Sequence, residues 1–215
     1  MTSVKLGLTV DEVLTTTRAV RRRLDVTRPV PRALLEECLE LAVQAPNGAN
    51  RNNWRWIIVD DPELIGKLAD EYRAAMRIYR DSRTGLAQLT DDVPGGEGIV
   101  ASAHALADKL HRMPAILIPL MPGRPDGKSL PEQAPMWGSI VQAVWSFFLA
   151  LRERGLGSVW ATVASRRERQ IAALLGIPHE EYTQIGMFPI AYTIGTDFKP
   201  ARRKPVSEVL TYNRF

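Results

Sequence analysis

The stretch MWGSIVQAVWSFFLALRERGLGSVW, residues 136–160, constrains the fold most, because it joins the longest apolar helical pattern of the chain to a short apolar strand. The pattern predicts a helix over 136–154, with Pro135 in its first turn. A narrow polar stripe interrupts the apolar surface at helical spacing, and it consists of Ser139, Gln142 and Ser146. Such a helix must be covered nearly all round.

A membrane span is the competing interpretation of this helix. Only about 16 residues separate its flanking charges, and Gln142 and Ser146 lie within it, whereas a span needs about 20 predominantly apolar residues. We therefore expect a core helix and no membrane association. Because one small sheet cannot cover so apolar a helix, we also expect the chain to associate with another subunit.

Composition predicts a single globular domain, 1–215, because no Pro/Gly/Ser-rich linker divides the 215 residues. The formal charge of +4 is concentrated at Arg18–Arg23 and Lys199–Lys204, which favours local anion sites over a nucleic-acid surface. The N-terminus lacks the apolar core of a signal peptide, and the single Cys38 excludes internal disulfides. We therefore expect a cytoplasmic protein.

Periodicity and capping residues predict an α+β fold, in which helices alternate irregularly with four or five strands. A helix is expected from the N-cap Thr9 to Arg23, which would place Arg18, Arg21 and Arg22 on one face. The other elements are expected as helices at 31–44, 62–80, 101–111 and, with Ser165 as N-cap, 165–177, and as strands at 56–60, 115–120, 158–164 and 185–195.

Three further features bear on function or topology. Residues 81–100 are predicted to be a long loop of the kind that commonly forms a lid. The basic, extended tail at 197–215 is expected to pack on a partner subunit. Pro189 predicts an edge position or an irregularity in the last strand, because proline donates no backbone hydrogen bond.

The sequence excludes several kinds of catalytic centre. No GxGxxG motif follows a strand, and there is no Walker A loop, zinc signature or GxSxG elbow. His104, His111 and His179 lack the spacing of metal ligands, so no metal site is expected. An enzyme with this sequence therefore needs a cofactor for its chemistry.

Two kinds of polar segment are candidates for holding a cofactor. The two basic clusters would meet on a phosphate, where each shielded charge-assisted hydrogen bond contributes about 1.5 to 3 kcal/mol; solvated surface is the alternative. The loop APNGANRNNWRW, residues 45–56, offers asparagine amides, and Gly48 permits close approach of backbone to a ligand. An asparagine-rich turn between helix and strand is the alternative for this loop.

Five strings in order, spanning nearly the whole chain, resemble the FMN-dependent nitroreductase family: TTTRAVRRRL, APNGANRNNWRW, GSIVQAVWSFFLALRERGLGSVW, LLGIPHEEY and ARRKP. The resemblance implies a small mixed or antiparallel sheet flanked by helices, and an intertwined homodimer with the long central helix at its interface. It implies FMN in a groove shared by both chains, held by Arg18, Ala19, Val20, Arg21 or Arg22, Pro46, Asn47, Gly48, Asn50, Ala161, Thr162, Val163, Arg202 and Arg203.

The family assigns roles to these residues. The arginines from both ends of the chain would bind the FMN phosphate, the asparagine loop would lie beside the ribityl chain or the isoalloxazine ring, and backbone at 161–164 would donate to flavin N5. Ala19 stands where the family often has serine, and Asn52 and Asn53 replace a common Gln-Pro pair. No match to the family's mid-chain Asn and Lys is evident in residues 80–100.

The resemblance implies an NAD(P)H oxidoreductase. Hydride would pass from NADPH or NADH to the flavin and then, in a ping-pong cycle, to a nitroaromatic, quinone or enone acceptor. A flavin-storage relative with little turnover is the alternative, and Ala19 motivates it. Nucleic-acid binding through Arg18–Arg23 is the weakest hypothesis, because no helix-turn-helix or RNA-binding signature accompanies the basic run.

Overall fold

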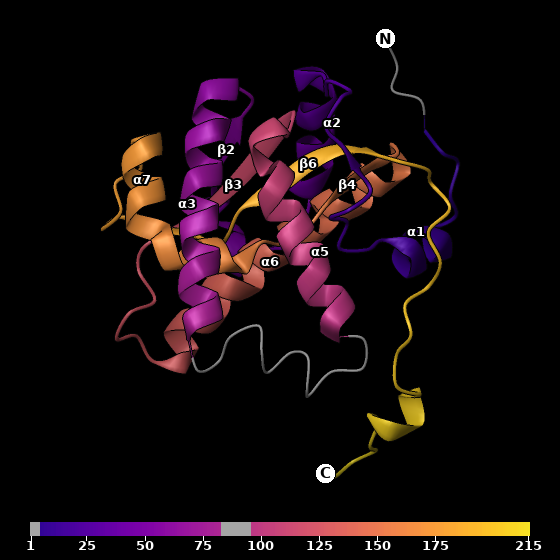
Figure 1. Cartoon of the computed structure of the whole chain (residues 1–215). Coiled ribbons are helices and arrows are strands. Elements are labelled where there is room, and N and C mark those ends of the chain that lie inside the picture. Colours follow the sequence, from indigo (N-terminus) through magenta and orange to yellow (C-terminus); the bar gives the residue numbers. More distant parts are fainter. Residues whose placement is uncertain (1–4, 83–95) are drawn as a thin grey trace.

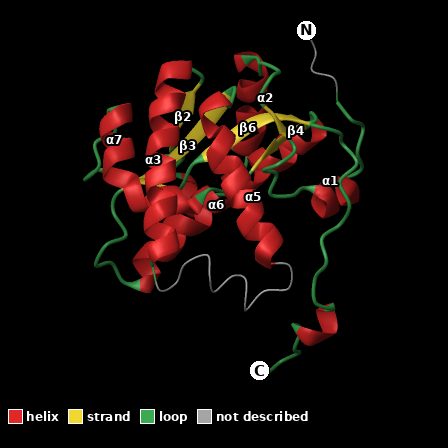
Figure 2. Cartoon of the chain, viewed as in Figure 1, coloured by secondary structure: helices red, strands yellow, loops and turns green. Residues whose placement is uncertain are grey.

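The computed structural model describes residues 5–82 and 96–215, and it confirms an α+β fold in which helices flank an antiparallel sheet (Figures 1 and 2). The helices are α1 (Val10–Thr16), α2 (Arg32–Ala42), α3 (Pro62–Asp81), α5 (Gly96–Lys109), α6 (Leu130–Glu153) and α7 (Glu168–Leu175). The strands are β1 (Leu24–Asp25), β2 (Arg55–Val59), β3 (Ala115–Pro122), β4 (Leu156–Ser158), β5 (Tyr182–Gln184) and β6 (Phe188–Thr193).

Strand β6 holds the sheet together, because it pairs with β3, β1 and β4, while β3 also pairs with β2 and β5. The predicted edge position of Pro189 is therefore wrong, but the predicted irregularity is confirmed. The β4–β6 ladder stops at the pair Ser158↔Ile190, and an isolated bridge Ala161↔Met187 continues the same register beyond it. Pro189 lies in the interval, where it has no N–H to donate.

Two hydrophobic cores lie on opposite faces of the sheet, and alternate residues of β3 divide between them. Ile116 and Ile118 belong to the core that contains apolar side chains of α3, α5 and α7. Ala115 and Leu117 belong to the core that contains those of α2 and α6. The sheet is thus the middle layer between two groups of helices.

The central helix α6 is longer than the sequence predicted. It has 24 residues, begins after the N-cap Ser129, and contains Pro135 in its interior, so the expected first-turn position of Pro135 is wrong. Ser129 N donates to Glu132 Oε2 at 2.9 Å, which satisfies one end of a capping box that precedes the apolar run. The start of this helix therefore follows from its cap, which lies six residues before Pro135.

The length argument against a membrane span is also wrong. Within the described parts of the chain, α6 is the one helix whose length and composition suffice to cross a membrane. Half of its apolar window is buried inside the fold, as expected of a core helix, and Phe147 and Ile140 are fully enclosed. Packing against α2 and the sheet accounts for these apolar residues.

Other boundaries differ where short or irregular elements replace regular ones. Residues 96–100 belong to α5, and residues 83–95 of the expected lid lie outside the described residues. The strand expected at 158–164 ends at Ser158, and Ser165 is not an N-cap but lies inside a 3-10 turn, Thr162–Arg167.

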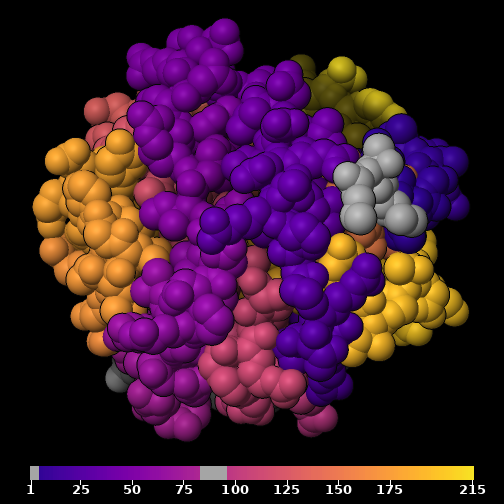
Figure 3. All heavy atoms as spheres, turned by 90° about the horizontal axis from the view of Figure 1, so that it is seen from above, coloured from indigo at the N-terminus to yellow at the C-terminus, as the bar shows by residue number. Residues whose placement is uncertain are grey.

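The N-terminal and C-terminal segments lie side by side on one flank of the body, as the indigo and yellow regions show (Figures 1 and 3). Leu6 N donates to Glu153 O at 2.8 Å, and Arg23 forms an ion pair with Asp197 at 2.6 Å. Beyond this contact the tail extends away from the body (Figure 1).

Replacement of Gly157 by alanine tests the close approach of β4 to its neighbours. The added Cβ would lie 2.8 Å from Thr193 Cγ2 and 3.0 Å from Val20 Cβ, so both would have to shift. We expect Gly157→Ala to lower the free energy of unfolding by about 1 to 3 kcal/mol. Urea denaturation measures the loss.

The matched control is Gly66→Ala in α3, where the added Cβ meets nothing within 4 Å. This change should raise the free energy of unfolding by about 0.5 to 1 kcal/mol, because alanine favours the helix. Equal stability of the two variants would contradict the packing described around Gly157.

Candidate functional site

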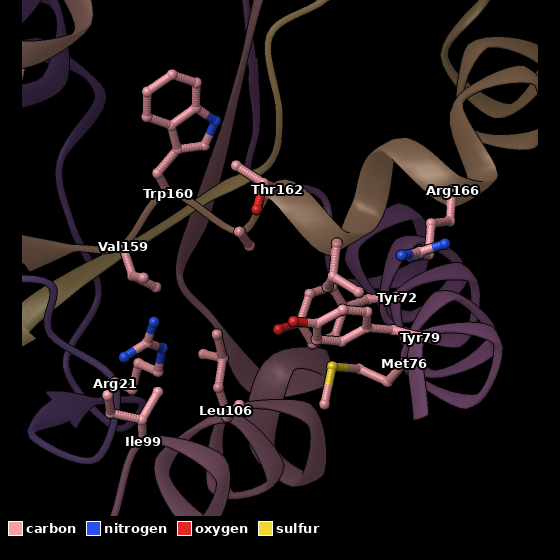
Figure 4. Close-up of a pocket in the computed structure, with 13 residues that line it drawn as sticks. Arg21, Tyr72, Met76, Tyr79, Ile99, Leu106, Val159, Trp160, Thr162 and Arg166 are labelled. Atoms are coloured by element: carbon pink, nitrogen blue, oxygen red, sulfur yellow. The ribbon is translucent and has the colours of Figure 1, made fainter. Parts of the chain in front are cut away.

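A pocket of about 280 Å³ opens between α3, α5 and the segment that follows β4 (Figure 4). We call it the Arg21 pocket. Its lining includes four residues that were predicted from the sequence to bind a cofactor, namely Arg21, Ala161, Thr162 and Val163. It also includes residues that the sequence analysis did not select, among them Tyr72, Met76, Tyr79 and Arg166.

The Arg21 pocket combines one buried cation with neutral aromatic groups. Burial lowers the pKa of Arg21, but a guanidinium remains charged in any case. Burial raises the pKa of Tyr72 to about 12, so its phenol is neutral at neutral pH. Tyr72 and Tyr79 line the side of the pocket formed by α3, and Figure 4 shows Arg21 on the opposite side. The pocket therefore suits a flat group that carries negative charge on one edge.

The three pocket residues on α3 had a signal in the sequence. Tyr72, Met76 and Tyr79 are spaced by four and three residues, so they share one helical face. Tyr72 and Met76 are buried, and Arg166 lies 5.0 Å from the centre of the Tyr79 ring. The spacing indicates a shared face, but only the tertiary packing shows that this face borders a pocket.

The arginine segment is not helical, so the predicted single face for Arg18, Arg21 and Arg22 is wrong. Helix α1 ends at Thr16, where the hydroxyls of Thr15, Thr16 and Thr17 bond to carbonyls four residues earlier. Such bonds and β-branched side chains weaken a helix end. The chain then runs extended beside β4.

Pairing with β4 directs Arg21 and Arg22 to different places. Ala19 forms a parallel bridge with Ser158, and Val20 N donates to Ser158 O at 2.8 Å. After this pairing Arg21 enters the pocket, whereas Arg22 is exposed. Of the two arginines between which the sequence did not decide, Arg21 is therefore the one that lines the pocket.

Lys109 holds the arginine turn in place, and the sequence analysis did not find it. Its Nζ donates to Arg22 O at 2.9 Å and to Leu24 O at 2.8 Å. Burial lowers the pKa of this ammonium. A lysine in the last turn of α5 carries no sequence signal for a contact with residues so distant in the chain. Lys109 therefore ties α5 to the turn that carries Arg21.

The segment after β4 lines the pocket with Ala161, Thr162 and Val163. Ala161 N donates to Met187 O at 2.9 Å, which fixes the start of the 3-10 turn. The first bond of that turn runs from Ala164 N to Ala161 O at 3.2 Å. The N–H groups of Thr162 and Val163 precede this bond, and such groups at a helix start commonly bind ligands.

The asparagine loop, residues 45–56, lies away from the Arg21 pocket. Gly48 N donates to Ser139 Oγ at 2.9 Å, so the loop packs on α6, against the core on the other face of the sheet. Asn47 and Asn52 bond to each other through Asn47 Nδ2 and Asn52 N, at 2.9 and 3.0 Å. One chain therefore does not bring Pro46, Asn47, Gly48 and Asn50 together with the Arg21 pocket.

The basic clusters at the two ends of the chain do approach each other. Arg18 Nη1 donates to Lys199 O at 2.9 Å, where the tail leaves the body. Arg202 and Arg203 follow in the exposed tail, and Arg203 Nη1 bonds to Arg202 O at 3.0 Å. The Arg18 side chain and the start of the tail are in contact, while Arg202 and Arg203 remain free to reach a ligand or another surface.

An ion pair beside the pocket anchors the end of the 3-10 turn. Glu168 accepts from Arg124 Nη1 at 2.7 Å and Nη2 at 3.0 Å, and from Gln184 N at 3.1 Å. Burial raises the pKa of Glu168, but the bonds from Arg124 and Gln184 outweigh burial and lower it overall. Glu168 lies five positions after Val163, so its bonds help to fix the position of residues 161–163, which line the pocket.

The stability that Glu168 provides should depend on pH. Because its pKa is lower in the folded chain than the usual 4.5, its contribution is complete above that value and is lost as pH falls through the folded pKa. We expect Glu168→Gln to cost about 1.5 to 3 kcal/mol at pH 7. The cost should shrink below pH 4.5, as urea denaturation across pH will measure.

Glu63→Gln is the control, because its ion pair with Lys67 is exposed. An exposed pair contributes at most about 0.5 kcal/mol, so this variant should stay close to the wild type at every pH. A cost for Glu168→Gln that does not change with pH would contradict the charged pair.

Comparison with known proteins identifies the fold family. A model of the Nitroreductase family matches residues 14–192. The chain belongs to the nitroreductase family. It is 30% identical over 200 residues to an iodotyrosine deiodinase of Thermotoga neapolitana, and this match covers 92% of the chain and 95% of that relative. An NADH dehydrogenase of Thermus thermophilus is 35% identical over 92 residues, which cover 38% of the chain and 43% of that protein.

Solved structures share this nitroreductase fold. An oxidised iodotyrosine deiodinase bound to FMN and 3-iodo-L-tyrosine has a TM-score of 0.72 at 23% identity, covering 96% of this chain and 100% of that one. A variant of the FMN- and NADPH-dependent nitroreductase NfnB, derived from sphigopyxis sp. strain HMH, has a TM-score of 0.72 at 22% identity, covering 97% of this chain and 100% of that one. At these identities the likeness establishes the common fold.

Proposed function

We propose that this nitroreductase-family protein is an oxidoreductase that binds FMN in the Arg21 pocket. The observation that carries the proposal is the convergence of the Arg21 guanidinium and the donor segment Ala161–Val163 on one pocket. The isoalloxazine ring is flat, and its reduced form is anionic at the N1 and O2 edge. The residues present fit such a group, because a buried cation and neutral phenols line the pocket.

In this proposal each part of the cofactor has its own protein groups. Arg21 stabilises negative charge at N1 and O2, and the N–H groups of Thr162 and Val163 donate near N5. Arg18, with Ala19 and Val20 beside it, and Arg202 and Arg203 from the tail, hold the phosphate. The contact between Arg18 and Lys199 supports the phosphate assignment, because it places the two basic clusters next to each other.

A homodimer would complete the site. The α6 surface away from the sheet keeps Trp145 at 44% exposure, with the exposed Gln142 one turn earlier. An exposed tryptophan on an otherwise buried core helix favours a subunit interface. We propose that the partner contributes its Pro46–Asn50 loop to the Arg21 pocket of this chain and receives the tail at 197–215. This arrangement accounts for the separation of the loop from the pocket within one chain.

When bound, FMN supplies the redox chemistry: it accepts hydride from NADH or NADPH and returns it to an electron acceptor, for which nitroaromatics, quinones and enones are the proposed classes. The chain's own contribution is binding and electrostatics. Arg21 compensates charge, the backbone of Thr162 and Val163 fixes the ring, and Tyr72 keeps a neutral wall. No protein acid or base is required at the reacting atom.

The alternative is a protein that stores FMN with little turnover. Ala19 favours it, because a serine there would offer the phosphate a hydroxyl that alanine lacks. Reduction of the bound flavin by a nicotinamide nucleotide distinguishes an oxidoreductase from a store.

Purification and anaerobic mixing test this function. We expect the purified protein to contain FMN, identified by mass, and NADPH or NADH to bleach it. Acceptors should then restore the oxidised spectrum, and 3-iodotyrosine belongs among those tried because a relative is named for its deiodination. Arg18→Ala combined with Arg203→Ala should lower FMN occupancy, because the loss of two charge-assisted bonds weakens FMN binding by about tenfold or more. Unchanged occupancy would refute the phosphate assignment, and bound flavin that neither nucleotide reduces would favour storage.

The role of Arg21 can be measured separately by potentiometric titration of the bound flavin. Loss of the charge in Arg21→Met removes about 1.5 to 3 kcal/mol of stabilisation from the anionic reduced form. This corresponds to a fall of about 30 to 60 mV in the two-electron midpoint potential. The matched control is the neighbouring exposed Arg22, and Arg22→Met should change the potential little. Equal shifts in both variants would contradict the placement of Arg21 beside the flavin.

A further inference from the structure

Two arginines at the end of α6 are buried to nearly the same extent but have different partners. Arg154 is 5% exposed, and its Nη2 forms an ion pair with Glu37 at 2.5 Å. Arg152 is 6% exposed, and its bonds go to neutral oxygens only: Nε donates to Thr16 Oγ1 and Nη2 to Thr196 O, each at 3.0 Å. Arg152 Nη1 is buried without any hydrogen-bond partner.

A second polar group near Arg152 is also without a partner. Ser158 is 1% exposed, and its Oγ is buried and makes no hydrogen bond. Both Arg152 and Ser158 line one small cavity, together with Arg18 and Phe198. Buried polar groups in proteins are nearly always satisfied, so two unsatisfied groups around one cavity point to an occupant that bonds to both.

The size of the cavity limits this occupant to a single small particle. The cavity leaves about 10 Å³ for the centre of a water-sized sphere, which is room for one particle of about that size. A phosphate group with four oxygens does not fit. The cavity is therefore too small to be the phosphate position proposed for FMN, although Arg18 borders both sites.

The charge around the cavity favours an anion over water. Water would bond to Arg152 Nη1 and Ser158 Oγ, but it would leave the buried guanidinium without a directly bonded counter-charge, beside the further cation Arg18. Glu153 and Glu12 act on Arg152 through their charge, against the charge of Arg23, but they bond to other groups: Glu153 accepts from Gly7 N at 2.9 Å, and Glu12 accepts from Thr9 N at 2.8 Å. Within the described residues, Arg152 has no ion pair.

We propose that this cavity binds one small monovalent anion, of the size of chloride, between Arg152 Nη1 and Ser158 Oγ. The anion is the counter-charge of Arg152, as Glu37 is the counter-charge of Arg154. It joins three segments that are distant in the sequence, because Arg152 also bonds to Thr16 in the N-terminal segment and to Thr196 before the tail. The bound anion thereby stabilises the flank of the molecule where Arg18 meets the tail.

The first test uses crystals of the full-length protein grown in sodium bromide, with diffraction measured at the bromine absorption edge. We expect an anomalous peak within hydrogen-bond distance of Arg152 Nη1 and Ser158 Oγ. The peak should be lost in Ser158→Ala or, if that variant does not fold, in Arg152→Met. A water molecule in the cavity, or an empty cavity, in the bromide crystals would overturn the proposal.

The second test compares melting temperatures in sodium chloride and in sodium gluconate at equal ionic strength, since gluconate is too large for the cavity. Chloride should raise the Tm of the wild type by about 2 to 4 °C, because it binds the folded chain only. Ser158→Ala should lose this rise. Ser146→Ala, on α6 and outside the cavity lining, should keep it. Equal rises in all three proteins would show a general salt effect and overturn the proposal.

Discussion

The backbone hydrogen bond from Val20 N to Ser158 O fixes the position of the arginine segment, and the candidate site depends on it. The bond places an irregular segment beside β4, next to Gly157, where Val20 and Thr193 leave no room for a side chain. Arg21 then enters the pocket, and the same strand continues into the donor segment Ala161–Val163. One short pairing thus brings together groups that lie about 140 residues apart in the sequence.

Long periodic elements were predictable because their own residues determine them. The apolar faces of α2 and α3 and the continuous apolar run of β3 are present in the sequence. β1 and β5 were missed, since strands of two or three residues have no period to detect. The early start of α6 had a signal in the capping pair Ser129 and Glu132, but Pro135 also suits a helix start and lies closer to the apolar run.

The site was predictable in part, and tertiary bonds explain the rest. Arg21 and Ala161–Val163 were selected from the sequence, and the structure brings them to one pocket. Tyr72 and Lys109 acquire their roles only when α3 and α5 pack beside the arginine turn. The stripe residue Ser139, whose place on the helix was open, is buried and bonds Gly48 N, so it supports the asparagine loop. Residue type alone does not reveal such a partner.

Pro189 has a consequence for how the molecule opens. Its missing N–H interrupts the ladder between β4 and β6. The hydrogen-bonded pairing therefore ends at Ser158 and resumes only at the bridge between Ala161 and Met187. Cooperative opening units in proteins follow such boundaries. Amide protons in β3 and β6 should then exchange with solvent at the rate of global unfolding, whereas those around Val159 and Trp160 exchange through a smaller local fluctuation. The residues that border the pocket can move without disrupting the sheet that holds them.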